Sequence, residues 1–175
     1  MPVRLYACTA LATITVVLAI SGEQLPDYYN VPAEVQKYVD MDHLTITDKY
    51  TLSGDLNPFY LRGDFDGDGH MDYALLITTT DTRKRGIAIW MSSRPKARWQ
   101  ILGAGHLFQY GAGKSDNLDF DAWHVYGKQP VMQGSGEIAP PPRLRAEAIL
   151  VEIKDSASGL IYWTGSSFAW YQQGD

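Results

Sequence analysis

The stretch FYLRGDFDGDGHMDYALLITT, residues 59–79, decides the fold of this chain. It places two strand-like segments, Phe59–Arg62 and Tyr73–Thr79, on either side of a short acidic segment. The second segment is apolar and rich in β-branched residues, which is typical of a buried strand. Because the acidic segment is short and rich in glycine, we expect a β-hairpin whose connection is an acidic loop at residues 64–72.

Four aspartates occupy relative positions 1, 3, 5 and 9 of this loop, with glycines between them. Carboxylates packed this closely repel one another unless a cation lies among them. Glycine tolerates positive φ, so Gly67 and Gly69 allow the chain to curl and turn its oxygens inward. The expected metal ligands are Asp64, Asp66, Asp68, the backbone carbonyl of His70, and Asp72, which ligates directly or through water.

Oxygen ligands in this number favour Ca²⁺ as the cofactor, with the stricter octahedron of Mg²⁺ as second choice. An EF-hand would need a glutamate at position 12 of the loop, where this chain has Leu75, and helices on both sides. We expect a structural metal, because the loop fills most coordination positions with protein oxygens. The alternative is a solvated acidic turn that binds no metal.

The loop resembles the calcium-binding loops of FG-GAP and VCBS-type repeats, which carry DxDxDGxxD between two strands. The matching residues are Asp64, Asp66, Asp68, Gly69 and Asp72. The resemblance implies that the aspartates ligate calcium. Those families build a β-propeller from several copies, whereas this chain has one, so we carry over the loop chemistry alone. The ending YWTGSSFAWYQQGD also resembles small uncharacterised exported bacterial proteins, which implies no activity.

Beyond the hairpin, short apolar runs alternate with polar turns, which is typical of a mainly β fold. We expect an antiparallel sheet or meander of about six to eight strands, preceded by one N-terminal amphipathic helix at Pro32–Val39. The further strands are expected at Gly86–Met91, Arg98–Leu102, Ala122–Tyr126, Ala146–Ile153, Leu160–Trp163 and Phe168–Tyr171. The alanines and glutamates of Ala146–Ile153 would also allow a helix.

Residues 1–21 have the pattern of a secretory signal peptide. Met1–Arg4 carries a positive charge, Leu5–Ile20 is apolar, and Ala19 and Ser21 stand at −3 and −1 of a cleavage point. The alternative is a retained anchor helix, for which the apolar run is short. We therefore expect a secreted or periplasmic protein that is not stably inserted in a membrane after cleavage.

The remaining residues, 22–175, are expected to form a single β-rich domain, since 20% charged and 45% hydrophobic residues are typical of globular proteins. The formal net charge of −5 and the absence of a basic run longer than Arg83–Arg85 argue against a nucleic-acid partner. Cys8, the only cysteine, lies in the predicted signal peptide, so the mature chain can form no disulfide.

Two functions are compatible with these features. We favour a non-enzymatic binding or interaction module, without catalytic residues, whose ligand is a protein or a glycan. The alternative is a hydrolase or enzyme inhibitor that acts on the cell envelope and uses His106, His124 and the acidic loop Asp116–Asp121.

Aromatic residues are concentrated in the predicted C-terminal hairpin. They are Tyr162, Trp163, Phe168, Trp170 and Tyr171. Neighbouring positions on a strand face opposite sides, so one side should fill the core. The other side is either core as well, which we favour, or an exposed aromatic platform for a ligand.

Overall fold

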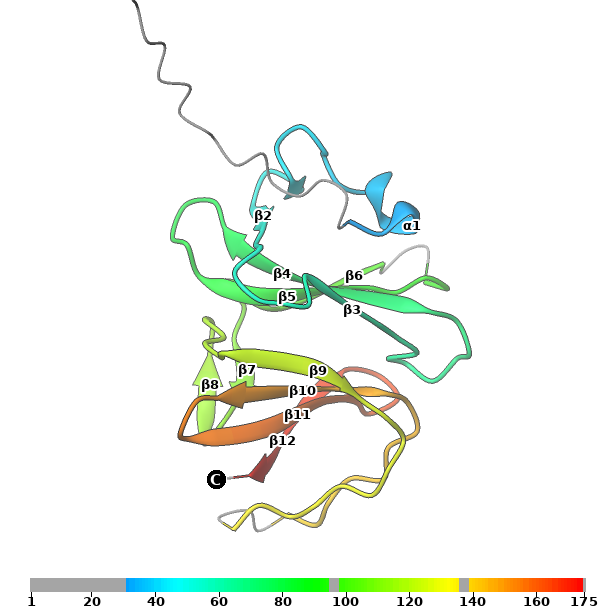
Figure 1. Ribbon diagram of the computed structural model, residues 1–175, viewed down its shortest axis with the longest axis vertical. Helices are drawn as coiled ribbons and strands as arrows, with labels where there is room; N and C mark the ends of the chain where they lie inside the picture. Colours follow the sequence, from blue (N-terminus) through cyan, green and yellow to red (C-terminus); the bar gives the residue numbers. More distant parts are fainter. Residues whose placement is uncertain (1–30, 95–97, 136–138, 175) are drawn as a thin grey trace, which may run out of the picture.

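The computed structural model describes residues 31–94, 98–135 and 139–174. The predicted signal peptide, residues 1–21, lies outside the described residues. Within them the fold is mainly β, made of antiparallel sheets with almost no helix (Figure 1). In this part of the chain, no helix has the length and apolar character needed to cross a membrane.

The predicted helix at Pro32–Val39 is reduced to a single turn, α1 (Ala33–Gln36). Its first hydrogen bond runs from the Val35 backbone N–H to the Pro32 carbonyl at 2.8 Å. One helical turn gains few hydrogen bonds against the cost of nucleation, so tertiary packing must hold this segment. That packing comes from Val35 and Val39, which are both buried.

The first sheet contains the hairpin around the acidic loop. Its strands are β1 (Thr45–Ile46), β2 (Tyr50–Leu52), β3 (Tyr60–Gly63), β4 (Asp72–Thr79), β5 (Arg85–Trp90) and β6 (Trp99–Gly103). The order is β1-β2-β4-β5-β6, and β3 also pairs with β4. One edge of β4 therefore carries two partners, β3 beside its first half and β2 beside its second half.

The second sheet is formed by the C-terminal part of the chain, and a small hairpin links the two sheets. The sheet consists of β9 (Ala122–Tyr126), β10 (Ala148–Ile153), β11 (Ala157–Trp163) and β12 (Phe168–Gly174), in the order β12-β11-β10-β9. The hairpin is β7 (Phe108–Tyr110) and β8 (Gly113–Ser115). The segment that composition left open between strand and helix, Ala146–Ile153, contributes strand β10.

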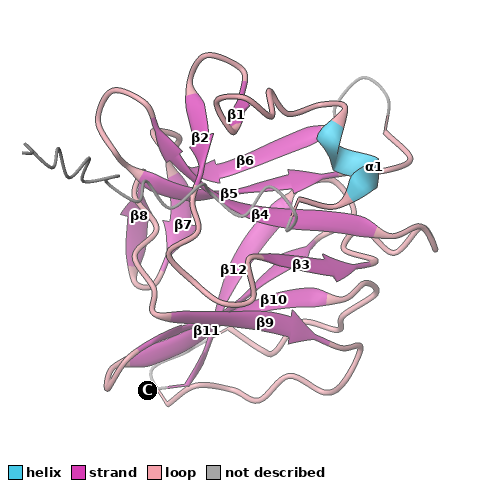
Figure 2. Ribbon diagram, turned by 45° about the horizontal axis from the view of Figure 1, so that its top comes forward, coloured by secondary structure: helices cyan, strands magenta, loops and turns pink. Residues whose placement is uncertain are grey.

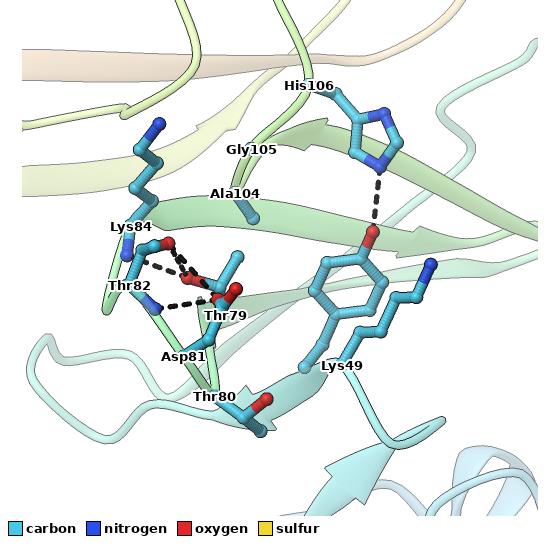
Figure 3. Close-up of a pocket in the computed structure, with 10 residues that line it drawn as sticks. Lys49, Thr79, Thr80, Asp81, Thr82, Lys84, Ala104, Gly105 and His106 are labelled. Atoms are coloured by element: carbon cyan, nitrogen blue, oxygen red, sulfur yellow. Dashed lines mark hydrogen bonds between the residues drawn. The ribbon is translucent and has the colours of Figure 1, made fainter.

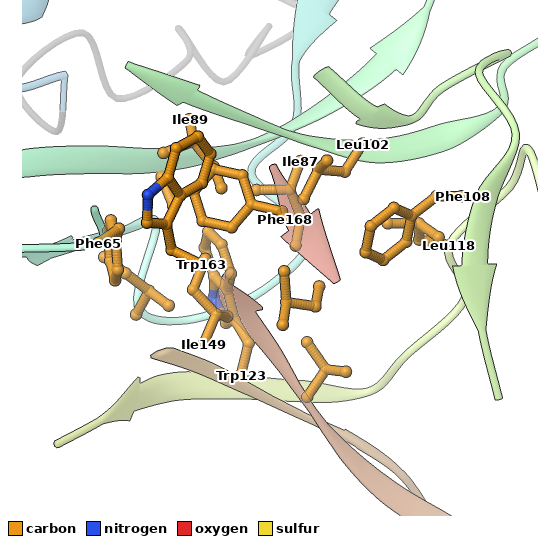
Figure 4. Packing of buried hydrophobic residues seen from close by; sticks show 14 of the residues in the cluster. Phe65, Ile87, Ile89, Leu102, Phe108, Leu118, Trp123, Ile149, Trp163 and Phe168 are labelled. Atoms are coloured by element: carbon orange, nitrogen blue, oxygen red, sulfur yellow. The ribbon is translucent and has the colours of Figure 1, made fainter. Parts of the chain in front are cut away.

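The two sheets lie over each other with the main hydrophobic core between them (Figure 2). Ile87 and Ile89 of β5 and Ile149 of β10 are completely buried there. Figure 4 shows these side chains beside the rings of Trp123 and Trp163. Burying an aliphatic side chain of this size contributes about 1.5–3 kcal/mol, so this core is the main source of stability.

Both sheets are also covered on their outer faces. Val31 and Val35 of the N-terminal segment pack against Leu75 and Ile77 on the outer face of β4. The outer face of the second sheet is covered by residues of the β9–β10 connection. Val131 and Leu144 from that connection pack against Leu150 and Leu160. The hydrophobic runs of β4 and β10 are thus explained by burial on two sides.

The strand count differs from the expectation of about six to eight strands in one sheet. The described residues form twelve strands in three sheets. The four strands that were not expected, β1, β2, β7 and β8, have only two or three residues each. Runs this short contain too few residues to show a period of two in the sequence.

The C-terminal aromatic residues belong to the core on both sides of the sheet. Trp163 and Phe168 are buried in the main core, with ring centroids 5.0 Å apart. Trp170 packs against the same core while half-buried. On the opposite face, Tyr162 packs against the outer cluster, and Tyr171 is 4% exposed. Core packing was the favoured interpretation, and these positions support it over an exposed platform.

A glycine on β5 gives a test of the first sheet. A Cβ added at Gly86 would lie 2.4 Å from the Leu102 carbonyl oxygen and 2.6 Å from the Ala104 nitrogen. Since these are backbone atoms, β6 would have to move, and we expect Gly86→Ala to lower the free energy of unfolding by about 2 kcal/mol or more. The control is Gly113→Ala on β8, where the new Cβ would meet nothing within 4 Å. Urea denaturation that gives equal losses for both variants would contradict this packing.

Candidate metal centre in the β3–β4 loop

The acidic loop joins two antiparallel strands, as the sequence predicted. Gly63 at the end of β3 pairs with Asp72 at the start of β4. Leu75, which stands where an EF-hand would have its glutamate, lies inside β4 and is 1% exposed. The loop therefore has the hairpin setting, and its flanks are strands rather than helices.

Phe65 fixes the loop to the protein interior. This residue stands between Asp64 and Asp66 and is completely buried in the core between the sheets. This anchor was not predicted from the sequence, although an aromatic residue between two aspartates is a signal for it. Because Phe65 is immobilised, the two flanking aspartates leave the core from a defined position.

Three of the predicted ligands converge. One carboxylate oxygen each from Asp64, Asp66 and Asp72 lies within 4.8 Å of the other two, an arrangement able to hold a metal ion. Asp72 is 0% exposed and Asp64 is 7% exposed. The Asp66 side chain is 1% exposed. Buried carboxylates of this kind require compensation by hydrogen bonds or by positive charge.

The Asp68 carboxylate and the His70 imidazole are not part of this group. The Asp68 carboxylate accepts hydrogen bonds from the Ser93 hydroxyl and from the His70 backbone N–H. The His70 imidazole is exposed, with Nδ1 3.2 Å from Asp68 Oδ1. Asp68 is also exposed. The imidazole thus interacts with Asp68 and is separate from the three converging carboxylates.

Backbone N–H groups hold all three carboxylates in place, and Asp66 accepts its bond from the Asp68 N–H at 3.3 Å. Asp64 accepts hydrogen bonds from Gly67 and Gly69 at 2.7 and 3.2 Å. Asp72 accepts them from Phe65 and Ser92 at 3.2 and 2.9 Å. Both glycines have positive φ, 77° for Gly67 and 87° for Gly69, as the curled loop was expected to require.

Two cations and one further carboxylate also reach the loop from distant parts of the chain. Arg94 Nε lies 2.8 Å from Asp66, and Lys128 Nζ lies 3.5 Å from Asp64. The Glu147 carboxylate accepts a hydrogen bond from the Asp64 backbone N–H at 2.7 Å. The four aspartates of the loop together with Glu147 outnumber the two cations, which leaves an excess of negative charge.

The most deeply buried carboxyl of the loop belongs to Asp72. Burial raises the pKa of Asp72 to about 6, and the nearby charges of Asp66 and Asp68 act in the same direction. Without a cation, Asp72 therefore takes up a proton near pH 6, above the usual range of an aspartate. A divalent ion among these oxygens would favour the ionised form instead.

The residues of the alternative enzymatic site are dispersed. His106 follows β6 of the first sheet, where its Nε2 lies 2.7 Å from the Tyr50 hydroxyl. His124 lies on β9 of the second sheet, 3.9 Å from Glu152. Among the described residues, no hydrogen bond or ion pair joins the two histidines.

The predicted acidic loop Asp116–Asp121 is likewise divided among structural contacts. Asp116 pairs with Lys84 at 2.5 Å and Asp119 with Arg85 at 2.8 Å. Asp121 accepts a hydrogen bond from the Lys154 backbone N–H at 2.7 Å. These aspartates therefore hold neighbouring segments together and do not converge with a histidine.

No protein family, curated protein or solved structure matches this chain. The resemblance of the loop to FG-GAP and VCBS-type repeats consequently rests on the loop residues themselves.

The raised pKa of Asp72 predicts a pH dependence of stability in the absence of metal. An ordinary aspartate in the unfolded chain has a pKa of about 3.9, so the folded state binds this proton more tightly. Ionisation of Asp72 therefore costs folding free energy, and the loss develops as pH rises from about 4 to about 7. In the presence of a chelator, we expect the free energy of unfolding of the wild type to fall by about 2 kcal/mol over this range relative to that of Asp72→Asn. Urea denaturation at each pH measures this difference. Parallel pH profiles for the two proteins would contradict the prediction.

Proposed function

We propose that this protein is an exported calcium-binding β domain in which the metal is structural. Asp64, Asp66 and Asp72 would supply the central carboxylate ligands. Asp68 and the backbone carbonyl of His70 would complete the shell, directly or through water. The observation that carries the proposal is the convergence of three buried carboxylates within 4.8 Å, in a loop that retains an excess of negative charge.

Calcium is the metal that these donors fit best. The three converging groups are carboxylates, and hard oxygen donors favour Ca²⁺ or Mg²⁺ over zinc. Calcium accepts six to eight ligands with flexible geometry, which suits a loop already shaped by its own backbone hydrogen bonds. The loop resemblance to FG-GAP and VCBS-type repeats points to the same ion.

A structural role is supported by the surroundings of the carboxylates. Phe65 anchors the loop in the core, and Glu147 ties Asp64 to the segment that precedes β10. Asp72 is fully buried at the start of β4. A cation held here would stabilise the hairpin and its contact with the second sheet, and it would have little surface open to a substrate.

The location and partner remain as the sequence predicts them. The signal-peptide pattern predicted at residues 1–21, which contains the sole cysteine, supports a secreted or periplasmic protein. We propose a non-enzymatic interaction module whose ligand is a protein or a glycan. The cell-envelope hydrolase or inhibitor is less well supported, because His106 follows β6 of the first sheet whereas His124 lies on β9 of the second sheet.

Thermal unfolding tests the calcium proposal. Calcium binds the folded state, so a free calcium concentration of 100 times Kd should raise the free energy of unfolding by about 2.7 kcal/mol. For a domain of this size, this corresponds to a rise in Tm of roughly 5–10 °C. We expect chelator to lower the Tm and Asp66→Ala to abolish this response. The control is Asp42→Ala, an exposed aspartate outside the loop, which should keep the full response.

Two outcomes would contradict the proposal. One is a wild-type melting curve that is unchanged by both chelator and added calcium. The other is a calcium response that Asp66→Ala retains in full. A response to Mg²⁺ equal to that for Ca²⁺ would contradict the choice of metal, since the flexible oxygen shell favours calcium.

A further inference from the structure

A pocket lies at the far end of β4 from the acidic loop. Its volume is about 450 Å³, within the range of small-molecule sites. β4 begins at Asp72 in the metal centre and ends at Thr79 in the pocket wall. At about 3.3 Å per residue, the two sites are about 23 Å apart.

Three chain connections meet to form this pocket. Lys49 comes from the β1–β2 hairpin, Asp81 and Lys84 from the β4–β5 turn, and Ala104 and His106 from the segment after β6 (Figure 3). Loops that converge at one end of a rigid sheet are common places for ligand binding. Leu107, next to His106, is 74% exposed at the edge of this region.

The walls of the pocket are fixed by hydrogen bonds. In the β4–β5 turn, the hydroxyls of Thr79 and Thr82 lie 2.7 Å apart, and the Lys84 N–H donates to Thr79 at 3.0 Å. The Thr80 N–H donates to the Lys49 carbonyl at 2.9 Å, which joins this turn to the β1–β2 hairpin. The site is therefore formed without a ligand, which lowers the entropy cost of binding.

Backbone strain is concentrated around the same pocket. Ala104 has φ 47° and lies between Gly103 and Gly105, which have φ 66° and 90°. Arg83 and Thr47, beside the other two walls, have φ 56° and 59°. Left-handed conformations cost an L-residue free energy and collect at functional sites when the surroundings hold them.

The polar groups of the pocket are balanced in charge. Lys84 is paired with Asp116 at 2.5 Å. Within the part of the chain that the structure describes, Lys49 and Asp81 form no ion pair. The lining thus offers one ammonium donor, one carboxylate acceptor and several hydroxyls that can do both.

We propose that this pocket binds a neutral sugar unit of a glycan. Sugar hydroxyls both donate and accept hydrogen bonds, so they match Lys49, Asp81 and the threonine hydroxyls without requiring a net charge. Tyr50 and Ala104 also line the pocket, but they are only 9% and 2% exposed, so recognition rests on the polar groups. The Tyr50 hydroxyl is held by His106 at 2.7 Å, which fixes the orientation of that ring.

This inference rests on the proposed role as a binding module and selects the glycan over the protein ligand. It does not depend on calcium, because the pocket and the acidic loop are formed by different connections at opposite ends of β4 (Figure 1). Sugar binding and the calcium response of the Tm are thus separate measurements. Either one can fail while the other holds.

The test is an NMR titration of the protein, in a buffer that contains Ca²⁺, with glucose, galactose and N-acetylglucosamine. Glucuronic acid and glycine serve as anionic and zwitterionic comparisons. We expect at least one neutral sugar to bind with a Kd of about 1 mM and to shift the amide signals of residues 79–84 and 104–107. Lys49→Met and Asp81→Asn should each weaken binding about tenfold. The matched controls, Lys154→Met and Asp155→Asn in the exposed β10–β11 turn, should change Kd less than about twofold.

Three results would overturn the proposal. The first is that none of the neutral sugars binds. The second is that binding survives both pocket substitutions, or shifts signals elsewhere. The third is that glycine or glucuronic acid binds more tightly than every neutral sugar, which would assign the pocket to a charged ligand.

Discussion

Burial of β4 on both faces is the constraint on which the rest of the structure depends. Ala74 and Leu76 face the core between the sheets, while Leu75 and Ile77 face the cluster under the N-terminal segment. A strand buried in this way must have every backbone group paired, which β2, β3 and β5 provide. The acidic loop is the connection that enters this strand, and the connection that leaves it forms one wall of the pocket.

The start of β4 brings opposing requirements together. The first residue of β4 is buried in the sheet. This residue is Asp72, whose charge is poorly solvated there. The N–H groups of Phe65 and Ser92 compensate part of the cost, and a cation would compensate more. Phe65 couples the loop to the core, so the geometry of the carboxylates and the packing of the two sheets are set together.

The sequence predicted those parts of the fold that are encoded locally. Strands such as Ala122–Tyr126 were predicted with their observed bounds, because their apolar runs are long enough to indicate a strand. Asp64, Asp66 and Asp72 were found because their spacing lies within nine residues. Glu147 was missed because it meets Asp64 across 83 positions, and a single sequence contains no signal for such a contact. The pocket was missed for the same reason, since three separate turns form it.

The contacts of Asp64 have a consequence for proteolysis. The cover of the second sheet, residues 127–147, begins near Lys128 and ends at Glu147, and both of these residues contact Asp64. Where the structure describes this cover, it contains no strand or helix. Its middle is held by the packing of Val131 and Leu144 and by hydrogen bonds from the Tyr126 and Tyr171 hydroxyls. Because it has no ladder of backbone hydrogen bonds, we expect it to open at a lower free energy than the sheets do. Release of Asp64 would free both ends together, so a protease would reach this cover more easily than it reaches either sheet.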